Sequence, residues 1–328
     1  MKVLVVGLGS MGKRRIRLLK RFENVTAIIG IDEREDRRSD VAEILSGGVY
    51  TSIAEALKEH PQIECVFICT SPLSHSGLIN EALDYNLNVF TEINLVSDGY
   101  AENMELARKK KKVLFISSTF YYREEIQYIR ERLAGKSRLN YMYHVGQYLP
   151  DWHPWESYKE FFVGDKRTNG CREIMAIEFP WLIGTFGDVE KFAVLSDNLS
   201  DLNIQYRDNY MIQLLHVNGN KGTLIVDIVS PKAVRNLEIY GEGIYYSWNG
   251  SPDGLEFFNA DANKIEKVEF HEMAEHIEGY EKFIVENAYE NEIRDFFSAI
   301  DKKVIPQYGF EQDLNVLKLI DKIEVANE

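Results

Sequence analysis

Three glycines near the start of the chain are spaced as a phosphate-binding turn requires. The apolar stretch VLVV at residues 3–6 leads into Gly7-Leu8-Gly9-Ser10-Met11-Gly12, and KRRIRLL follows with the pattern of a helix. Gly7 permits a tight turn, Gly9 lets the backbone approach a pyrophosphate, and Gly12 lets the helix pack on the strand. Backbone N–H groups and the helix dipole then favour phosphates. We therefore expect Gly7, Gly9, Ser10, Met11 and Gly12 to bind a dinucleotide, rather than to form a glycine-rich turn without a ligand.

An acidic residue lies where the second strand of such a fold ends. Asp32 follows the last glycine by about twenty residues, the spacing at which a carboxylate accepts hydrogen bonds from the adenosine ribose. This carboxylate favours NAD, because it would repel the 2′-phosphate of NADP. Arg34, Arg37 and Arg38 lie just beyond it and could bind that phosphate, so NADP is the less favoured alternative.

A second turn of small polar residues follows the apolar stretch ECVFIC. Thr70, Ser71 and Pro72 would end that strand at the carboxyl edge of the sheet, where open α/β sheets bind their ligands. We expect this turn to let the nicotinamide half of the cofactor pass. His75 follows, and two readings are open for it: a contact with the cofactor, or a residue of a helix start bonded only to backbone or water.

An aromatic loop, DWHPW, occupies residues 151–155. Trp152 and Trp155 offer flat faces that suit the apolar side of a sugar ring, and His153 could exchange a proton with a substrate. The same tryptophans could instead anchor the loop by packing. We expect them to contact the substrate.

The elements that would position these residues form two domains. Short apolar, β-branched stretches, each followed by a turn and an apparent helix, predict a doubly wound parallel sheet, a Rossmann fold, over residues 1–120. Longer alternating stretches predict an α+β domain over 121–328 with a large, mostly antiparallel open sheet and a C-terminal helix able to pack back on the first domain. The predicted strands of the first domain are 2–6, 25–31, 63–70, 88–91 and 113–118.

Composition excludes several classes of partner. A net charge of −14 disfavours nucleic acid and anionic lipid, and no stretch approaches the roughly twenty apolar residues that cross a membrane. Cys65, Cys69 and Cys171 have no metal-ligand spacing, and their odd number argues against a disulfide framework. We therefore expect a cytoplasmic protein without a bound metal, whose partner is a small molecule.

The order of these motifs resembles the Gfo/Idh/MocA family of sugar and cyclitol oxidoreductases over nearly the whole chain. Beyond the glycine turn and Asp32, the resemblance rests on TSPLSH, VFTEINLVSD and the C-terminal ENEIRDFFSAIDKKVIPQYGFEQDLNVLKLIDKIE. It implies hydride transfer between NAD and a CH–OH or ketone carbon of a sugar, sugar nucleotide or sugar acid. It also implies homodimers or homotetramers formed through the second sheet, and a subgroup associated with surface-glycan sugar biosynthesis.

The sequence departs from this family at the residue used for proton transfer. The family motif usually reads Glu-Lys-Pro, whereas this chain has Glu92-Ile93-Asn94. Glu92 matches and is expected beside the cofactor, but isoleucine cannot take up the proton of a substrate hydroxyl. The family's second site motif corresponds to residues 169–178, which places Glu178 at or beside the family's histidine. Arg172 in this segment would hold a carboxylate or phosphate of the substrate.

Three residues could replace the lysine: Glu178, His153 and Glu173. A buried glutamate with a raised pKa, or a histidine, exchanges protons near neutral pH. Each glutamate also has an ordinary reading, Glu173 as a favourable charge at a helix start, paired with Arg172, and Glu178 as a paired buried carboxylate. Two other functions stay open: a catalytically silent protein that binds a nucleotide or sugar, and an NAD-assisted epimerase or lyase without net redox.

Overall fold

The computed structural model describes residues 1–153, 156–270, 274–275 and 284–326, and its chain divides into two compact units. Unit 1 comprises Met1–Ser118 and Tyr289–Leu314, and unit 2 comprises Thr119–Ala288 and Asn315–Glu328. The sequence-based boundary at residue 120 assigned residues 121–328 to the second domain, with a C-terminal helix able to pack back on the first. In the structure the chain returns to unit 1 at Tyr289.

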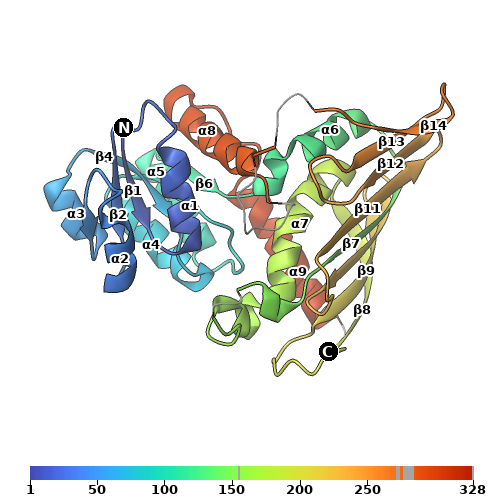
Figure 1. Cartoon of the computed structure of the whole chain (residues 1–328), viewed down its shortest axis with the longest axis horizontal. Coiled ribbons are helices and arrows are strands. Elements are labelled where there is room, and N and C mark those ends of the chain that lie inside the picture. Colours follow the sequence, from blue (N-terminus) through green and yellow to red (C-terminus); the bar gives the residue numbers. More distant parts are fainter. Residues whose placement is uncertain (154–155, 271–273, 276–283, 327–328) are drawn as a thin grey trace. The chain divides into compact units, whose positions relative to one another are not determined.

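Unit 1 contains a six-stranded parallel sheet in the order β3-β2-β1-β4-β5-β6, the strand order of a Rossmann fold. Its central strands are continuous apolar stretches because helices cover both faces (Figure 1). This confirms the predicted fold class. The strands are β1 (Lys2–Val6), β2 (Ala27–Ile31), β3 (Val49–Tyr50), β4 (Ile63–Ile68), β5 (Asn88–Thr91) and β6 (Leu114–Ile116), and the helices are α1 (Ser10–Leu19), α2 (Glu35–Ala42), α3 (Ile53–Glu59), α4 (Pro72–Asp84), α5 (Tyr100–Lys110) and α8 (Glu286–Lys302).

Helix α8 belongs to unit 1 because of a cluster of aromatic rings. Phe67, Phe90 and Phe115 lie on neighbouring strands, with stacked ring centroids 4.6 and 5.1 Å apart. Phe296 of α8 meets all three rings edge-on at 5.4 to 5.6 Å, and Phe297 packs beside it. Such contacts add to the hydrophobic burial of each ring, so the helix closes one face of the parallel sheet.

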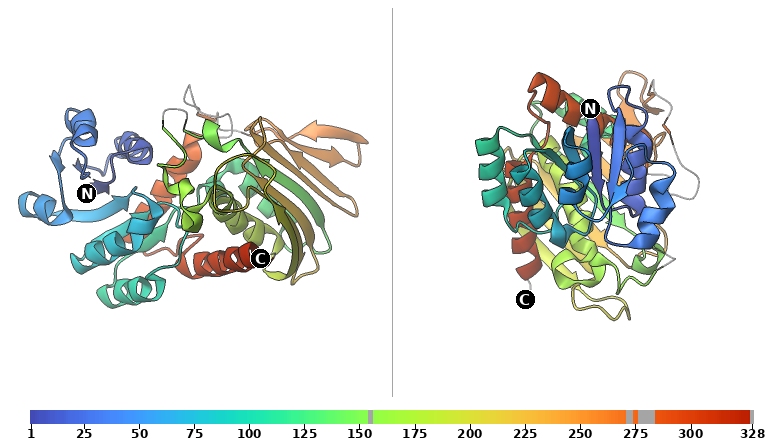
Figure 2. Two further views of the ribbon diagram at one scale, coloured as in Figure 1. Left: turned by 90° about the horizontal axis from the view of Figure 1, so that it is seen from below. Right: turned by 90° about the vertical axis from the view of Figure 1, so that its left-hand side faces the viewer.

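Unit 2 contains an eight-stranded sheet in the order β14-β13-β12-β11-β7-β10-β9-β8, in which only the β7–β10 pair is parallel. Burial alternates along its strands, because helices cover one face of the sheet and leave the other open (Figure 2). Its strands are β7 (Asn140–Gly146), β8 (Val189–Asp197), β9 (Asn209–His216), β10 (Lys221–Asp227), β11 (Val234–Gly241), β12 (Ile244–Trp248), β13 (Leu255–Asn259) and β14 (Lys264–Lys267).

The helices of unit 2 present their apolar sides to this sheet. Trp181 of α7, for example, is fully buried against Tyr143 of β7, with ring centroids 5.3 Å apart. None of the helices in the described ranges is long and apolar enough to cross a membrane. The helices are α6 (Glu124–Leu133), α7 (Gly170–Phe186) and α9 (Phe310–Val325, which begins in unit 1), with 3-10 turns η1 (Thr119–Tyr122), η2 (Leu149–Asp151), η3 (Phe162–Gly164) and η4 (Lys166–Thr168).

Candidate functional site

The glycine turn between β1 and α1 has the geometry that a pyrophosphate needs. Gly7 adopts φ +89°, and a Cβ built there would lie 2.7 Å from the carbonyl oxygen of Cys69 on β4's end. A Cβ on Gly12 would lie 1.9 Å from the carbonyl oxygen of Gly7. Neither position admits a side chain, so the turn depends on both glycines.

The start of α1 offers backbone N–H donors and has no acidic side chain that would repel a phosphate. Its N-cap is Gly9, which supplies no side-chain cap, and the first turn holds no acidic residue. The first N–H groups of a helix have no intrahelical partner, and Ser10 is exposed beside them while Met11 is half-buried. The residues present therefore fit the phosphates of a dinucleotide, which is what the sequence predicts for Gly7 to Gly12.

Asp32 lies at the end of β2 with its carboxylate held by backbone. Its Oδ2 accepts the N–H of Leu8 at 2.8 Å and its Oδ1 accepts the N–H of Arg34 at 2.9 Å. Arg37 places Nη1 3.7 Å from the same Oδ2 and also approaches Gly9. Arg34 instead pairs with Asp36, and Arg38 donates to main-chain oxygens. Of the three arginines, Arg37 is the one directed at the glycine turn.

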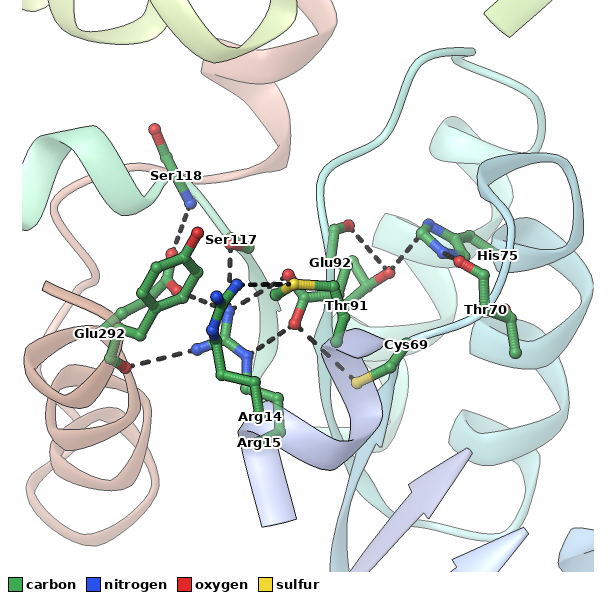
Figure 3. Close-up of polar contacts among 12 residues, drawn as sticks. Arg14, Arg15, Cys69, Thr70, His75, Thr91, Glu92, Ser117, Ser118 and Glu292 are labelled. Carbon is green, nitrogen blue, oxygen red and sulfur yellow. Dashed lines mark hydrogen bonds and ion pairs between the residues drawn. The ribbon is translucent and has the colours of Figure 1, made fainter. Parts of the chain in front are cut away.

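The turn after β4 also forms as expected at the carboxyl edge of the sheet. Ser71 is the N-cap of α4 and Pro72 its first residue, where a proline fits without loss of a hydrogen bond. The hydroxyl of Thr70 lies 2.7 Å from that of Ser74. His75 is 1% exposed, and its Nε2 lies 3.0 Å from the carbonyl oxygen of Thr70 (Figure 3). His75 is therefore bonded within the protein.

Glu92 is part of a buried charge cluster (Figure 3). Arg15 of α1 donates to it from Nε at 2.6 Å and from Nη2 at 3.1 Å, and also to Glu292 of α8 at 2.7 Å. Glu292 in turn accepts the N–H of Ser118 at 2.6 Å. Burial alone would lower the pKa of Arg15, but the two carboxylates hold that pKa above its ordinary value. Arg15 therefore ties α1 to the end of β5 and to α8, and Glu92 has a structural role as one of its two partners.

In unit 2, α7 carries three of the predicted residues, two of them at its start. Asn169 caps the helix by accepting the N–H of Arg172 at 2.8 Å. The Arg172 side chain pairs with Asp321 at 2.5 Å and with Glu324, both on α9. The ordinary reading paired Arg172 with Glu173; its ion-pair partners are instead on α9, because α7 and α9 lie side by side there. These carboxylates already occupy the guanidinium that was expected to hold a substrate anion.

Glu178 lies further along α7 and is completely buried. Its Oε1 accepts from Arg235 at 2.6 Å, and its Oε2 accepts from Tyr143 at 2.8 Å and from Trp181 at 2.7 Å. An ion pair and hydrogen bonds of this kind offset the free-energy cost of burying a carboxylate. The geometry favours the structural reading of Glu178 over the catalytic one.

Glu173 is in a different environment. Its Oε2 is buried and has no hydrogen-bond partner among the described residues, although part of the side chain stays accessible. Burial raises the pKa of Glu173 to about 8. A carboxyl with this pKa is largely protonated at neutral pH and exchanges its proton close to it, which suits general acid–base chemistry.

The aromatic loop is only partly described. The Trp152 indole donates to the carbonyl oxygen of Gln147 at 3.1 Å and packs within 3.6 Å of the position of a Cβ on Gly170 at the start of α7. His153 lies 2.8 Å from a carboxylate oxygen of Glu156, and its ring packs at a tilt against Phe161. Trp155 lies outside the described residues. The structure therefore brings Trp152 to the same helix end as Glu173.

Comparison with known proteins agrees with this geometry. The model of an oxidoreductase family with an NAD-binding Rossmann fold, Gfo/Idh/MocA, matches residues 1–118. These residues belong to the Gfo/Idh/MocA family. The match agrees with the NAD-binding Rossmann fold that the motifs predict for these residues.

The curated relatives of this chain are 26% to 29% identical to it over the matched residues. Biliverdin reductase A of Mus musculus is 26% identical over 64% of this chain and 64% of its own length, and matches to two further curated relatives span 46% and 34% of theirs. Among solved structures, a UDP-N-acetylglucosamine 3-dehydrogenase of Acidithiobacillus ferrooxidans superposes with a TM-score of 0.77 at 16% identity, covering 99% of this chain and 97% of its own. A levoglucosan dehydrogenase in complex with NADH gives 0.79 at 15% identity over 98% and 95%. These likenesses show that the fold of both units is shared.

Two residues of the site were not predicted from the sequence. Arg15 and Glu292 are far from Glu92 along the chain, and a charged residue inside a helix ordinarily predicts a solvated face. The only signal was position: Arg15 follows Gly12 by three residues, which places it on the helix face that packs on the sheet.

Proposed function

We propose that this member of the Gfo/Idh/MocA family transfers hydride between NAD(H) and a hydroxyl-bearing or carbonyl carbon of a sugar-like substrate. The observation that carries the proposal is the start of α1, where two glycines that admit no Cβ surround uncapped N–H groups. Bound there, NAD would supply the hydride acceptor. Asp32 would hold the adenosine ribose, and its carboxylate supports a preference for NAD over NADP.

Glu173 is our candidate for the proton-transfer group in place of the absent lysine. Its raised pKa keeps it protonated near neutral pH, so it would donate a proton to the substrate oxygen in reduction and accept one in oxidation. Trp152 at the same helix end would support the apolar side of the ring. Of the three predicted groups, Glu178 is paired with Arg235 and His153 is bonded to Glu156, which leaves Glu173 as the best supported.

Cofactor binding is the first test. Calorimetric titration with NADH and NADPH should give saturable binding with NADH preferred. Gly12→Val should lose binding by at least about tenfold, because its side chain cannot avoid the carbonyl oxygen of Gly7. Gly77→Ala on α4, where a Cβ meets nothing within 4 Å, is the matched control and should bind as the wild type does. Equal binding by the Gly12 variant would contradict the proposed site.

The preference for NAD has its own test. Asp32→Ala should weaken NADH binding and narrow the difference between NADH and NADPH, since the carboxylate no longer bonds the ribose or repels a 2′-phosphate. Arg37 would then be free to meet that phosphate. An unchanged ratio of the two affinities would contradict the role of Asp32.

Turnover tests the role of Glu173. NADH oxidation is followed with a panel of keto-sugars, sugar nucleotides and sugar acids, and Glu173→Gln should abolish activity on any substrate found while NADH affinity is unchanged. Glu160→Gln, an exposed glutamate with the same chemical change, is the control. Full activity in Glu173→Gln would assign the proton transfer elsewhere.

A linear tetrapyrrole is the second candidate substrate. The similarity to a biliverdin reductase covers 213 residues, well beyond the family match, and the lysine for a sugar hydroxyl is replaced by Ile93. Biliverdin therefore belongs in the panel. NADH oxidation by biliverdin and by none of the sugars would replace the sugar-like substrate.

Self-association is also proposed, through the open face of the eight-stranded sheet. Large apolar side chains are exposed on that face, among them Met142, Met211 and Leu195, on strands whose other side is buried. Covering such a surface with a second copy is a common solution. Light scattering should give twice or four times the chain mass, and Met211→Glu should reduce it; a monomer at all concentrations would contradict this.

A further inference from the structure

A continuous chain of buried hydrogen bonds runs through unit 1 from His75 to Asp313. His75 Nδ1 lies 2.6 Å from Oδ1 of Asn94, the Nδ2 of Asn94 donates to the hydroxyl of Tyr100 at 2.9 Å, and Tyr100 donates to Asp313 Oδ2. All four side chains are no more than 4% exposed. Asn94 contacts both His75 and Tyr100. The usual family motif has proline at this position, which has no polar side chain and could not make these contacts.

One end of this chain has a fixed polarity. His75 Nε2 lies 3.0 Å from the carbonyl oxygen of Thr70, which can only accept. Nε2 therefore carries a hydrogen. Nδ1 is then protonated only when the imidazole is positively charged, and it is an acceptor when the ring is neutral.

The remaining bonds can be satisfied in two ways. In the first, Nδ1–H of a charged His75 donates to Oδ1 of Asn94, Asn94 donates to Tyr100, and Tyr100 donates to the ionised Asp313. In the second, the Asn94 amide is rotated, so that it donates to a neutral His75 and accepts from Tyr100, which accepts from a protonated Asp313. Both arrangements contain the same number of protons.

We propose that Asn94, Tyr100 and Asp313 are positioning residues for His75, forming a relay that holds one proton, so that His75 and Asp313 are either both charged or both neutral. A second proton would leave two donors facing each other at one link of the chain. Loss of the proton would leave two acceptors facing each other. Either state strands a buried polar group without a partner, which is costly.

The surroundings do not relieve these conflicts. Thr91 has its hydroxyl 3.2 Å from His75 Nδ1, but a hydroxyl can donate or accept and so favours neither state. Glu92 acts electrostatically on His75 and is already neutralised by Arg15. Tyr308 donates to the other carboxylate oxygen of Asp313 at 2.8 Å, which leaves Oδ2, facing Tyr100, as the oxygen that carries the relay proton.

Burial changes the proton affinities of the two ends of the relay in opposite directions, which brings them closer together, as sharing requires. Burial raises the pKa of Asp313 to about 6, against the hydrogen bonds from Tyr100 and Tyr308. Burial lowers the pKa of His75, against its hydrogen bonds to Asn94 and Thr70. For the proposed function, the consequence is that the charge beside the Thr70 turn does not follow the pH of the solvent. That consequence rests on the proposed function, whereas the relay does not.

Nitrogen-15 NMR of the imidazole rings tests the relay in the cofactor-free protein. The protein has seven histidines, and His75→Gln identifies the His75 signals by their loss. In the wild type, these signals should stay constant from about pH 5.5 to about pH 8, on either side of the ordinary histidine pKa. In Asp313→Asn, His75 should titrate alone with a midpoint below about 6.5, because an amide can face Tyr100 with either its oxygen or its nitrogen.

Two further variants keep the test decisive if Asp313→Asn does not fold. Tyr100→Phe interrupts the relay and should also release His75 to titrate. Tyr308→Phe makes the same chemical change in a tyrosine that contacts Asp313 but lies outside the relay, and the His75 signals should then stay constant with pH. A wild-type His75 that titrates as it does in Tyr100→Phe would overturn the proposal. NADH added to the same samples reports separately on the proposed function.

Discussion

Replacing Glu173 with glutamine should make the protein more stable at alkaline pH and leave it unchanged in acid. Burial raises the pKa of Glu173 from 4.5 to about 8. Between these values the folded protein holds a proton that the unfolded chain releases, so the free energy of unfolding falls as the pH rises through this window. This pKa difference of about 3.5, at about 1.4 kcal/mol for each pH unit, corresponds to about 5 kcal/mol in the free energy of unfolding. Because part of the side chain stays accessible, we expect about 2 to 3 kcal/mol.

Urea unfolding at pH 5 and pH 8.5 measures this difference. Trp152, Trp155, Trp181 and Trp248, the four tryptophans of the chain, all belong to unit 2, so their fluorescence follows the unit that contains Glu173. The gain of Glu173→Gln over wild type should appear at pH 8.5 and vanish at pH 5. Glu160→Gln should show no such gain at either pH. A Glu173 variant that is equally stable relative to wild type at both pH values would refute the protonated, buried carboxyl and, with it, our candidate acid.

Three other outcomes follow from the same contacts. Glu92→Gln should destabilise unit 1 by about 3 to 5 kcal/mol in urea unfolding followed by circular dichroism, because it breaks a buried ion pair with Arg15, whereas Glu290→Gln, at a surface pair, should cost under about 1 kcal/mol. Arg172→Met should loosen α9, seen as faster amide hydrogen exchange over residues 315–324; unchanged exchange would contradict the ion pairs. The rate of the reductive reaction should be constant below about pH 8 and fall above it, as Glu173 loses its proton; a rate that rises there would exclude Glu173 as the acid.

The Rossmann unit could be predicted because its signals are local. Apolar strands, glycine turns and Asp32 each carry their meaning within a few residues, and their order fixed the sheet. Strand β3 was missed because two residues are too few for a pattern. The return of α8 to unit 1 was missed as a domain boundary because it depends on aromatic contacts between Phe296 and strands some two hundred residues earlier in the sequence.

The candidate site shows the same difference between local sequence signals and long-range contacts. Motif spacing singles out the residues expected to bind the cofactor, but it does not choose among the candidate proton-transfer groups. Glu173 and Glu178 are both glutamates on one apolar helix, and what separates them is that Arg235, fifty-seven residues beyond Glu178, pairs with one and not with the other. The sequence pattern indicates that a buried carboxylate needs a partner. Only the three-dimensional structure shows that Glu178 has Arg235 as its partner.

The charge of the site bears on what the substrate can be. A lysine that donates its proton starts as a cation, whereas a protonated Glu173 starts neutral and becomes an anion, so the site is one charge more negative throughout. Arg172, the nearest cation on the helix, is offset by Asp321 and Glu324. An anionic group on the substrate would therefore meet repulsion at this helix end, unless it displaced one of these pairs at a cost. The charge at this helix end therefore favours a neutral sugar or ketone over a sugar acid, and the least charged members of the substrate panel are the first to try.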